Sequence, residues 1–131
     1  MKQKSYQNST KNILGKLPIW NLKDLYESPK SKKLNNDLNN LRTSAKKFEK
    51  KYASKIANLS PNQLLKAIIE LEDIDTKMDK IMSYAHLLVA EDGNNERNKI
   101  FYQQMQEQIT NIASSIVFFS LEINEISEKN L

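Results

Sequence analysis

The chain has 131 residues, which is enough for one domain with a buried core, and 27% of them are charged, for a net charge of +4. It contains no cysteine, so a disulfide scaffold is excluded. Its N-terminal stretch is polar, so we expect no secretory signal, no membrane span and no membrane partner, and we expect the protein to be cytoplasmic.

The first predicted segment, residues 1–16, is rich in Lys, Gln, Asn and Ser. It carries too little apolar surface to offset the entropy of ordering, so we predict a disordered polar tail. From residue 17 onward the chain is different. With two glycines and three prolines in the whole sequence, long helices are favoured over a sheet with many turns. We therefore predict an all-α domain over residues 17–131.

Two Ser-Pro pairs, at residues 28–29 and 60–61, are each predicted to begin a helix. Serine can accept a hydrogen bond from an unpaired N–H group at a helix N-terminus, and proline suits the first helical position. After each pair, apolar residues recur at spacings of three and four, which is typical of an amphipathic helix. After the first pair, the predicted stripe consists of Leu34, Leu38, Leu41, Ala45, Phe48, Tyr52 and Ile56. We predict the first helix over 29–57 and the second over 61–92.

A third helix is predicted over 95–125, after a turn at Gly93. Glycine readily adopts the left-handed conformation that often ends a helix, and Asn94 or Asn95 can cap the helix that follows. Because the connections are short, successive helices should pack antiparallel. The sequence thus predicts three long antiparallel amphipathic helices, arranged as a bundle or a coiled-coil-like set.

Two short segments carry a resemblance to a known family. One segment follows the pattern Trp-x-Leu-x-Asp-Leu-Tyr, and the other begins with Tyr-x-x-Leu and ends on an acidic residue. The matching positions are Trp20, Leu22, Asp24, Leu25 and Tyr26 in the first segment and Tyr84 and Asp92 at the ends of the second. They resemble the N-terminal helical region of oligoendopeptidase F-like zinc metallopeptidases over residues 17–131.

The resemblance implies a role for the domain and for its aromatic residues. In such an enzyme this helical region precedes the catalytic region and bounds the channel through which short peptides reach the zinc. It also implies that Trp20 and Tyr26 lock the entry segment across the helices. As an alternative, Trp20 is the largest apolar anchor of an aliphatic core.

The residues needed for zinc catalysis are not in this chain. A zinc peptidase needs His-Glu-x-x-His on a helix, because two histidines one turn apart bind one metal ion while the glutamate handles the proton of water. The sequence has a single histidine, His86, for which we predict a packing or surface role. The acidic cluster Glu72, Asp75 and Asp79 lacks the glycine turn and loop carbonyls of a Ca²⁺ site. We therefore expect no catalytic residue, no metal ligand and no cofactor here, and zinc only in a complete enzyme.

The charge distribution suggests a rival function. Residues 1–55 contain 14 Lys or Arg and 4 Asp or Glu, whereas residues 56–131 contain 6 and 12. A basic half can bind nucleic acid weakly and without sequence preference. However, the basic residues of the first helix are spread over its whole polar side and do not form one binding face. The second helix is acidic, so we expect opposite charges of the two helices to face each other. We disfavour nucleic acid as a partner.

The stretch 112–123 is apolar nearly all round, so its helix should be buried on more than one side. Val117, Phe118 and Leu121 are the residues that three helices would leave exposed, and we name them as a candidate interface. Three alternatives would cover these residues: a separate catalytic peptidase chain, a second copy in a homo-oligomer, or residues 17–26 folding back. The sequence therefore predicts a non-catalytic N-terminal domain of an oligoendopeptidase F-like peptidase, or alternatively a helical protein-protein interaction module.

Overall fold

The structure is a computed structural model that describes residues 25–129. The predicted disordered tail, 1–16, lies outside the described residues. So do three residues of the first family-like segment, Trp20, Leu22 and Asp24. Leu25 and Tyr26 are described, and both are buried.

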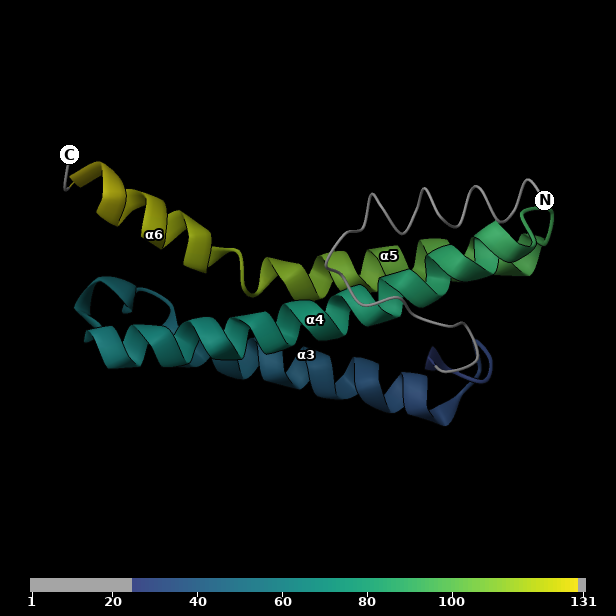
Figure 1. The fold of residues 1–131 in the computed structure, drawn as a ribbon, viewed down its shortest axis with the longest axis horizontal. Helices are drawn as coiled ribbons and strands as arrows, with labels where there is room; N and C mark the ends of the chain where they lie inside the picture. Colours follow the sequence, from purple (N-terminus) through teal and green to yellow (C-terminus); the bar gives the residue numbers. More distant parts are fainter. Residues whose placement is uncertain (1–24, 130–131) are drawn as a thin grey trace, which may run out of the picture.

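Between Leu25 and Lys129 the structure is helical and contains no strand, which confirms the all-α fold class (Figure 1). No helix in this part of the chain has both the length and the apolar character needed to cross a bilayer. The elements that the structure describes in full are α3 (Lys32–Tyr52), the short 3₁₀ turn η1 (Ile56–Asn58), α4 (Pro61–Glu91), α5 (Glu96–Ser114) and α6 (Phe118–Lys129).

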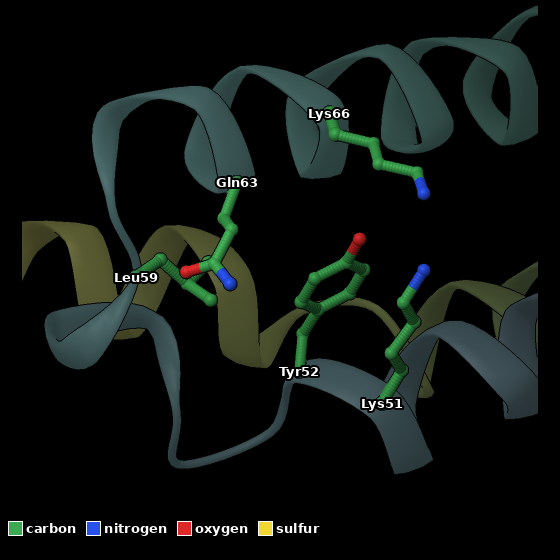
Figure 2. Close-up of a pocket in the computed structure, with 5 residues that line it drawn as sticks. All are labelled: Lys51, Tyr52, Leu59, Gln63 and Lys66. Carbon is green, nitrogen blue, oxygen red and sulfur yellow. The ribbon is translucent and has the colours of Figure 1, made fainter.

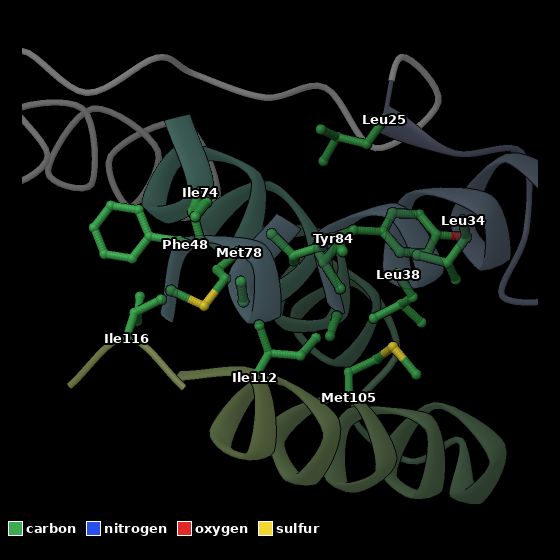
Figure 3. Close-up of a cluster of buried hydrophobic side chains, with 14 of the residues drawn as sticks. Leu25, Leu34, Leu38, Phe48, Ile74, Met78, Tyr84, Met105, Ile112 and Ile116 are labelled. Atoms are coloured by element: carbon green, nitrogen blue, oxygen red, sulfur yellow. The ribbon is translucent and has the colours of Figure 1, made fainter. Parts of the chain in front are cut away.

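The longest helix, α4, is the centre of the fold. Both α3 and α5 pack along it and also contact each other, whereas α6 rests on η1 (Figure 1). In Figure 3, Leu38 of α3, Met78 of α4 and Met105 of α5 point into the core that these helices share. All seven residues predicted for the apolar stripe of the first helix are buried: Leu34, Leu38, Leu41, Ala45, Phe48, Tyr52 and Ile56.

The prediction that the first helix begins at Pro29 is wrong, because α3 begins at Lys32. Ser28 and Pro29 form a turn instead. The Ser31 N–H donates to the Ser28 carbonyl at 3.0 Å, and the Lys30 N–H donates to Ser28 Oγ at 3.2 Å. Serine at the first and proline at the second position are typical of such turns. The pair therefore completes a turn before the helix starts.

The prediction that the first helix continues to residue 57 is also wrong, since α3 ends at Tyr52. Ser54 adopts a left-handed conformation with φ of 65°, which an α-helix cannot include. The chain then turns through a Lys55 N–H bond to the Tyr52 carbonyl at 2.9 Å. This turn places Ile56 in the core, where it is 3% exposed.

The second Ser-Pro pair begins a helix as predicted, and α4 starts at Pro61. The Gln63 N–H donates to Ser60 Oγ at 3.2 Å, and the Ser60 N–H donates to Gln63 Oε1 at 2.9 Å. This reciprocal capping box pairs two backbone donors that the helix itself cannot pair.

The turn between α4 and α5 differs from prediction in one respect. Gly93 does not adopt the left-handed backbone, so it does not end α4 in the expected way. The turn is closed instead by the Asn95 N–H, which donates to the Asp92 carbonyl at 3.3 Å. Asn95 caps α5, as one of the two predicted candidates, because its Oδ1 accepts from the backbone of Arg97 and Asn98 at 2.9 and 3.3 Å.

The predicted third helix, 95–125, is two helices. The break covers residues 115–117, between α5 and α6, and α6 continues to Lys129. It contains neither glycine nor proline. Its physical cause is tertiary, because Phe119 and Glu122 of α6 contact the end of α3 and the turn after it.

Candidate functional site

The two family-like segments meet in an aromatic junction formed by Tyr26, Tyr84 and Phe101. The Tyr84 ring of α4 lies edge-on to Tyr26, with centroids 5.2 Å apart, and edge-on to Phe101 of α5 at 5.9 Å. Tyr84 is 1% exposed, and Leu25 beside Tyr26 is equally buried. Edge-to-face contacts of this kind add to the stabilisation from burial. The junction thus fixes the chain at residues 25–26 onto α4.

Polar contacts tie the junction to α3 as well. The Tyr26 hydroxyl donates to Asp37 Oδ2 at 2.6 Å, and Lys80 Nζ of α4 lies 3.8 Å from the same oxygen. Lys80 also lies 4.9 Å from the centroid of the Tyr26 ring. Burial, together with the bond to Asp37 and its negative charge, raises the pKa of Tyr26 above its ordinary value. The phenol therefore stays neutral and remains a donor at physiological pH.

Tyr26 thus contacts α3 through Asp37 and α4 through Lys80 and Tyr84, and the partners Asp37 and Lys80 were not predicted. Their only sequence signal is that each charge stands beside an apolar position of its helix. Asp92, at the other end of the second family-like segment, is exposed at the C-terminus of α4 and is not part of the junction.

The single histidine lies on the surface. Tyr102 of α5 packs edge-on against the His86 ring at 4.8 Å between centroids, and its hydroxyl is 3.3 Å from His86 Nε2. Within residues 25–129, no group of three or more His, Cys, Asp or Glu is placed to hold a metal ion.

The acidic cluster on α4 leads to a prediction about stability. Partial desolvation of the Asp75 carboxylate, and then the charges of Asp79 and Glu72, raise its pKa. The folded chain therefore disfavours the ionised form of Asp75. The ionised carboxylate lowers the free energy of unfolding at pH values above its pKa, and this cost disappears as the pH falls through that pKa and the group is protonated. We expect Asp75→Asn to raise the free energy of unfolding at neutral pH by about 0.3–0.5 kcal/mol, the size of a like-charge pair on a helix surface.

Urea denaturation at several pH values measures this effect. The gain should shrink at acid pH and at high salt, which screens surface charges. Asp73→Asn is the matched control on the same helix. Asp73 Oδ2 pairs with Lys77 Nζ at 2.9 Å, so this change should give no gain. Equal gains from both variants would contradict the local repulsion.

Opposite charges do meet between α3 and α4, as predicted. Lys51 Nζ of α3 lies 3.1 Å from Glu70 Oε1 of α4. In a second ion pair the acidic residue, Asp37, is on α3 and the basic residue, Lys80, is on α4. Arg42 of α3 donates to Gln108 Oε1 of α5 at 2.9 Å. Two ion pairs therefore join α3 to α4, and a hydrogen bond to a neutral amide joins α3 to α5.

A shallow hollow of about 280 Å³ lies where α3 ends and α4 begins (Figure 2). Figure 2 shows Lys51 and Tyr52 of α3 on one side and Gln63 and Lys66 of α4 on the other. Lys51 is paired with Glu70 and lies 5.0 Å from the Tyr52 ring centroid, and Gln63 belongs to the capping box. Of these polar groups, Lys51 therefore links α3 to α4, and Gln63 caps the start of α4.

The three residues predicted as an interface have different environments in the structure. Val117, the last residue of the break, and Leu121, in the first turn of α6, are 51% and 58% exposed. Phe118 is half-buried, with its ring centroid 5.6 Å from that of Phe48. The outer α6 surface therefore consists of Val117 and Leu121, one helical turn apart, while Phe118 holds α6 to α3.

The candidate features of residues 25–129 are thus a buried aromatic junction and the outer α6 surface. The first fixes helices relative to one another, and the second offers apolar side chains to another molecule. Both are features of a packing domain. Comparison of the chain with protein-family models, with curated proteins and with solved structures gave no match.

Proposed function

We propose that this chain is the N-terminal helical domain of an oligoendopeptidase F-like metallopeptidase. On its own it is non-catalytic. Joined to a catalytic region in the cytoplasm, it bounds the channel that admits short peptides and restricts access by folded proteins. The zinc of such an enzyme would be held by the catalytic region and not by this domain.

The contact between Tyr26 and Tyr84 is the observation that carries this proposal. These residues belong to the two segments that resemble the family, they are 58 positions apart in the sequence, and their ring centroids lie 5.2 Å apart. The bond from Tyr26 to Asp37 extends the contact to a third segment. A domain that lines a channel has to keep its shape, and a junction joining three segments supports that role.

The second support is the outer α6 surface. Val117 and Leu121 are more than half exposed and stand four residues apart, and neighbouring exposed apolar side chains are a candidate interaction site. A catalytic region packed against α6 would cover them. The same observation favours the alternative function, a helical interaction module that binds another protein through α6.

A binding experiment tests the proposal. The full chain is mixed with the catalytic region of an oligoendopeptidase F-like peptidase that was expressed without its own N-terminal helices. We expect the two to associate, as measured by calorimetry. Val117→Asp with Leu121→Asp should weaken binding on the order of tenfold or more, because buried apolar contacts carry most of the energy of an interface.

Leu65→Asp with Ile69→Asp is the matched control. Leu65 and Ile69 are 57% and 58% exposed, also one turn apart, but they lie on α4. This variant should bind like the native chain. No association, or equal loss in both double variants, would contradict the proposed packing.

A peptidase assay tests the non-catalytic part of the proposal. We expect the purified chain to leave a fluorogenic peptide uncut in the presence of added zinc, because it lacks His-Glu-x-x-His. Zinc-dependent cleavage that co-purifies with the chain through several columns would overturn this. The gene beyond the codon for Leu131, read in all three frames, is a further check: a His-Glu-x-x-His segment there would support the proposal, and an unrelated continuation would favour the interaction module.

A further inference from the structure

The break between α5 and α6 has the backbone of a hinge. The Ser115 and Ile116 N–H groups donate to carbonyls three residues earlier, those of Ile112 and Ala113, at 3.0 and 3.1 Å. Hydrogen bonds of this 3₁₀ type inside a longer helical stretch often mark a functional hinge. Ser115 itself keeps helical angles, with φ of −74° and ψ of −20°.

The local sequence does not require this break. Residues 115–117 are Ser, Ile and Val, none of which stops a helix as proline does. The apolar stripe also continues across the break at helical spacing, through Ile112, Ile116, Phe119 and Ile123. A straight helix over 96–129 would keep this stripe on one side. The bend must therefore be maintained by contacts elsewhere in the fold.

Two sets of contacts hold α6 in the bent position. Phe119 and Phe118 pack on Phe48 of α3, with ring centroids 6.0 and 5.6 Å apart. The Glu122 carboxylate accepts two backbone N–H groups of the turn after α3, from Ser54 at 2.7 Å and from Ile56 at 3.3 Å. We call these two bonds the Glu122 clamp.

One bond of the Glu122 clamp is made by Ser54, a residue with an unusual backbone conformation. This serine is left-handed, with φ of 65°, a conformation that costs free energy for a residue with a side chain. In that conformation its N–H points to a carboxylate that comes from 68 residues further along the chain. Bonds to an ionised acceptor are stronger than neutral ones. The turn and α6 therefore stabilise each other.

We propose that α6 is a hinged arm with two positions, and that the Glu122 clamp sets the balance between them. In the docked position α6 is bent onto η1 and α3. In the released position residues 96–129 form one straight helix about 50 Å long, given a rise of about 1.5 Å per residue. Release uncovers Phe48 and the inner face of α6, so the apolar surface of the domain changes with the position of the arm.

Spin-label distances in the full chain test the proposal. Because the protein has no cysteine, a cysteine pair at Asn58 of η1 and Glu125 of α6, both exposed, can be labelled specifically. The native chain should give a short distance with a narrow distribution. Glu122→Gln keeps the side-chain shape but removes the charge. It should raise the ratio of released to docked arm about tenfold, equivalent to ~1.4 kcal/mol, and add a longer distance.

Glu128→Gln is the matched control, because Glu128 is an exposed glutamate of the same helix. It should leave the distance distribution unchanged. A distribution that stays at the docked distance in Glu122→Gln would overturn the proposal, as would the same change in Glu128→Gln.

Amide hydrogen exchange separates a straightened arm from a melted one. In Glu122→Gln, the Ser54 and Ile56 amides should exchange faster because the clamp is lost. The amides of residues 115–117 should exchange more slowly, because they gain helical bonds to carbonyls four residues earlier. Faster exchange throughout 115–129 would mean that α6 unfolds when undocked, and the hinge would then be wrong.

Discussion

Replacing Tyr84 with alanine is expected to lower the free energy of unfolding by about 3–5 kcal/mol, the range for removing a large buried aromatic side chain. Tyr84 is 1% exposed and its ring contacts both Tyr26 and Phe101. The change would leave a cavity between α4, α5 and the chain at residue 26. Because a domain of this size has a total stability of about 5–15 kcal/mol, the variant should be close to unfolding at room temperature. Urea denaturation followed by circular dichroism measures the loss.

Tyr84→Phe is the control for this change. It keeps the ring and its edge-to-face contacts and removes the hydroxyl alone, so the loss should stay below ~1 kcal/mol. Tyr102→Ala is a second control, since Tyr102 is half-buried and packs on the surface residue His86. Its cost should fall well below that of Tyr84→Ala. Similar losses in Tyr84→Ala and Tyr102→Ala would show that the junction adds no special stability.

Apolar periodicity was sufficient to predict the fold class and much of the core. Along α3 and the turn after it, the spacing of three and four residues identified every buried position from Leu34 to Ile56. This works because a helix that packs on one side has to place its apolar residues on that side, whatever its neighbours are. Ser60 was also predictable, since a capping box needs only residues within one turn.

Helix ends that depend on distant contacts were not predictable. The break at 115–117 exists although its sequence permits a helix, because Glu122 and Phe119 bind parts of the chain more than sixty residues away. The left-handed backbone at Ser54 was also not predictable, because the residue is not a glycine, the usual sequence signal for that conformation. The predicted helix start at Pro29 was wrong for a different reason, because a Ser-Pro pair suits a turn as well as a helix start.

The candidate site was predictable only in part. Tyr26 and Tyr84 were identified from short patterns, and the structure places them in contact. Asp37 and Lys80, which hold the Tyr26 hydroxyl and ring, look like ordinary charged residues of a helix surface in the sequence. A charged side chain at the edge of an apolar stripe reveals its partner only when the helices are packed together.

Phe48→Ala is expected to have the second large effect, a loss of about 3–5 kcal/mol in the free energy of unfolding. Phe48 is 3% exposed, and its ring contacts Tyr52 at 4.9 Å between centroids as well as Phe118 and Phe119. The change should therefore also weaken the docking of α6. Denaturation measures the first effect, and hydrogen exchange across α6 measures the second.

Phe118→Ala separates the two effects of Phe48→Ala. Phe118 is half-buried and touches Phe48 from the α6 side, so its removal should loosen α6 while costing global stability less, about 1–2 kcal/mol. Faster exchange in α6 for both variants, with a large loss of global stability only for Phe48→Ala, is the expected pattern. It would show that α6 rests on the core without being needed for it. If Phe118→Ala destabilised the chain as much as Phe48→Ala, α6 would be an integral part of the cooperative core, and the aromatic contacts at Phe48 would unite α3 and α6 in a single folding unit.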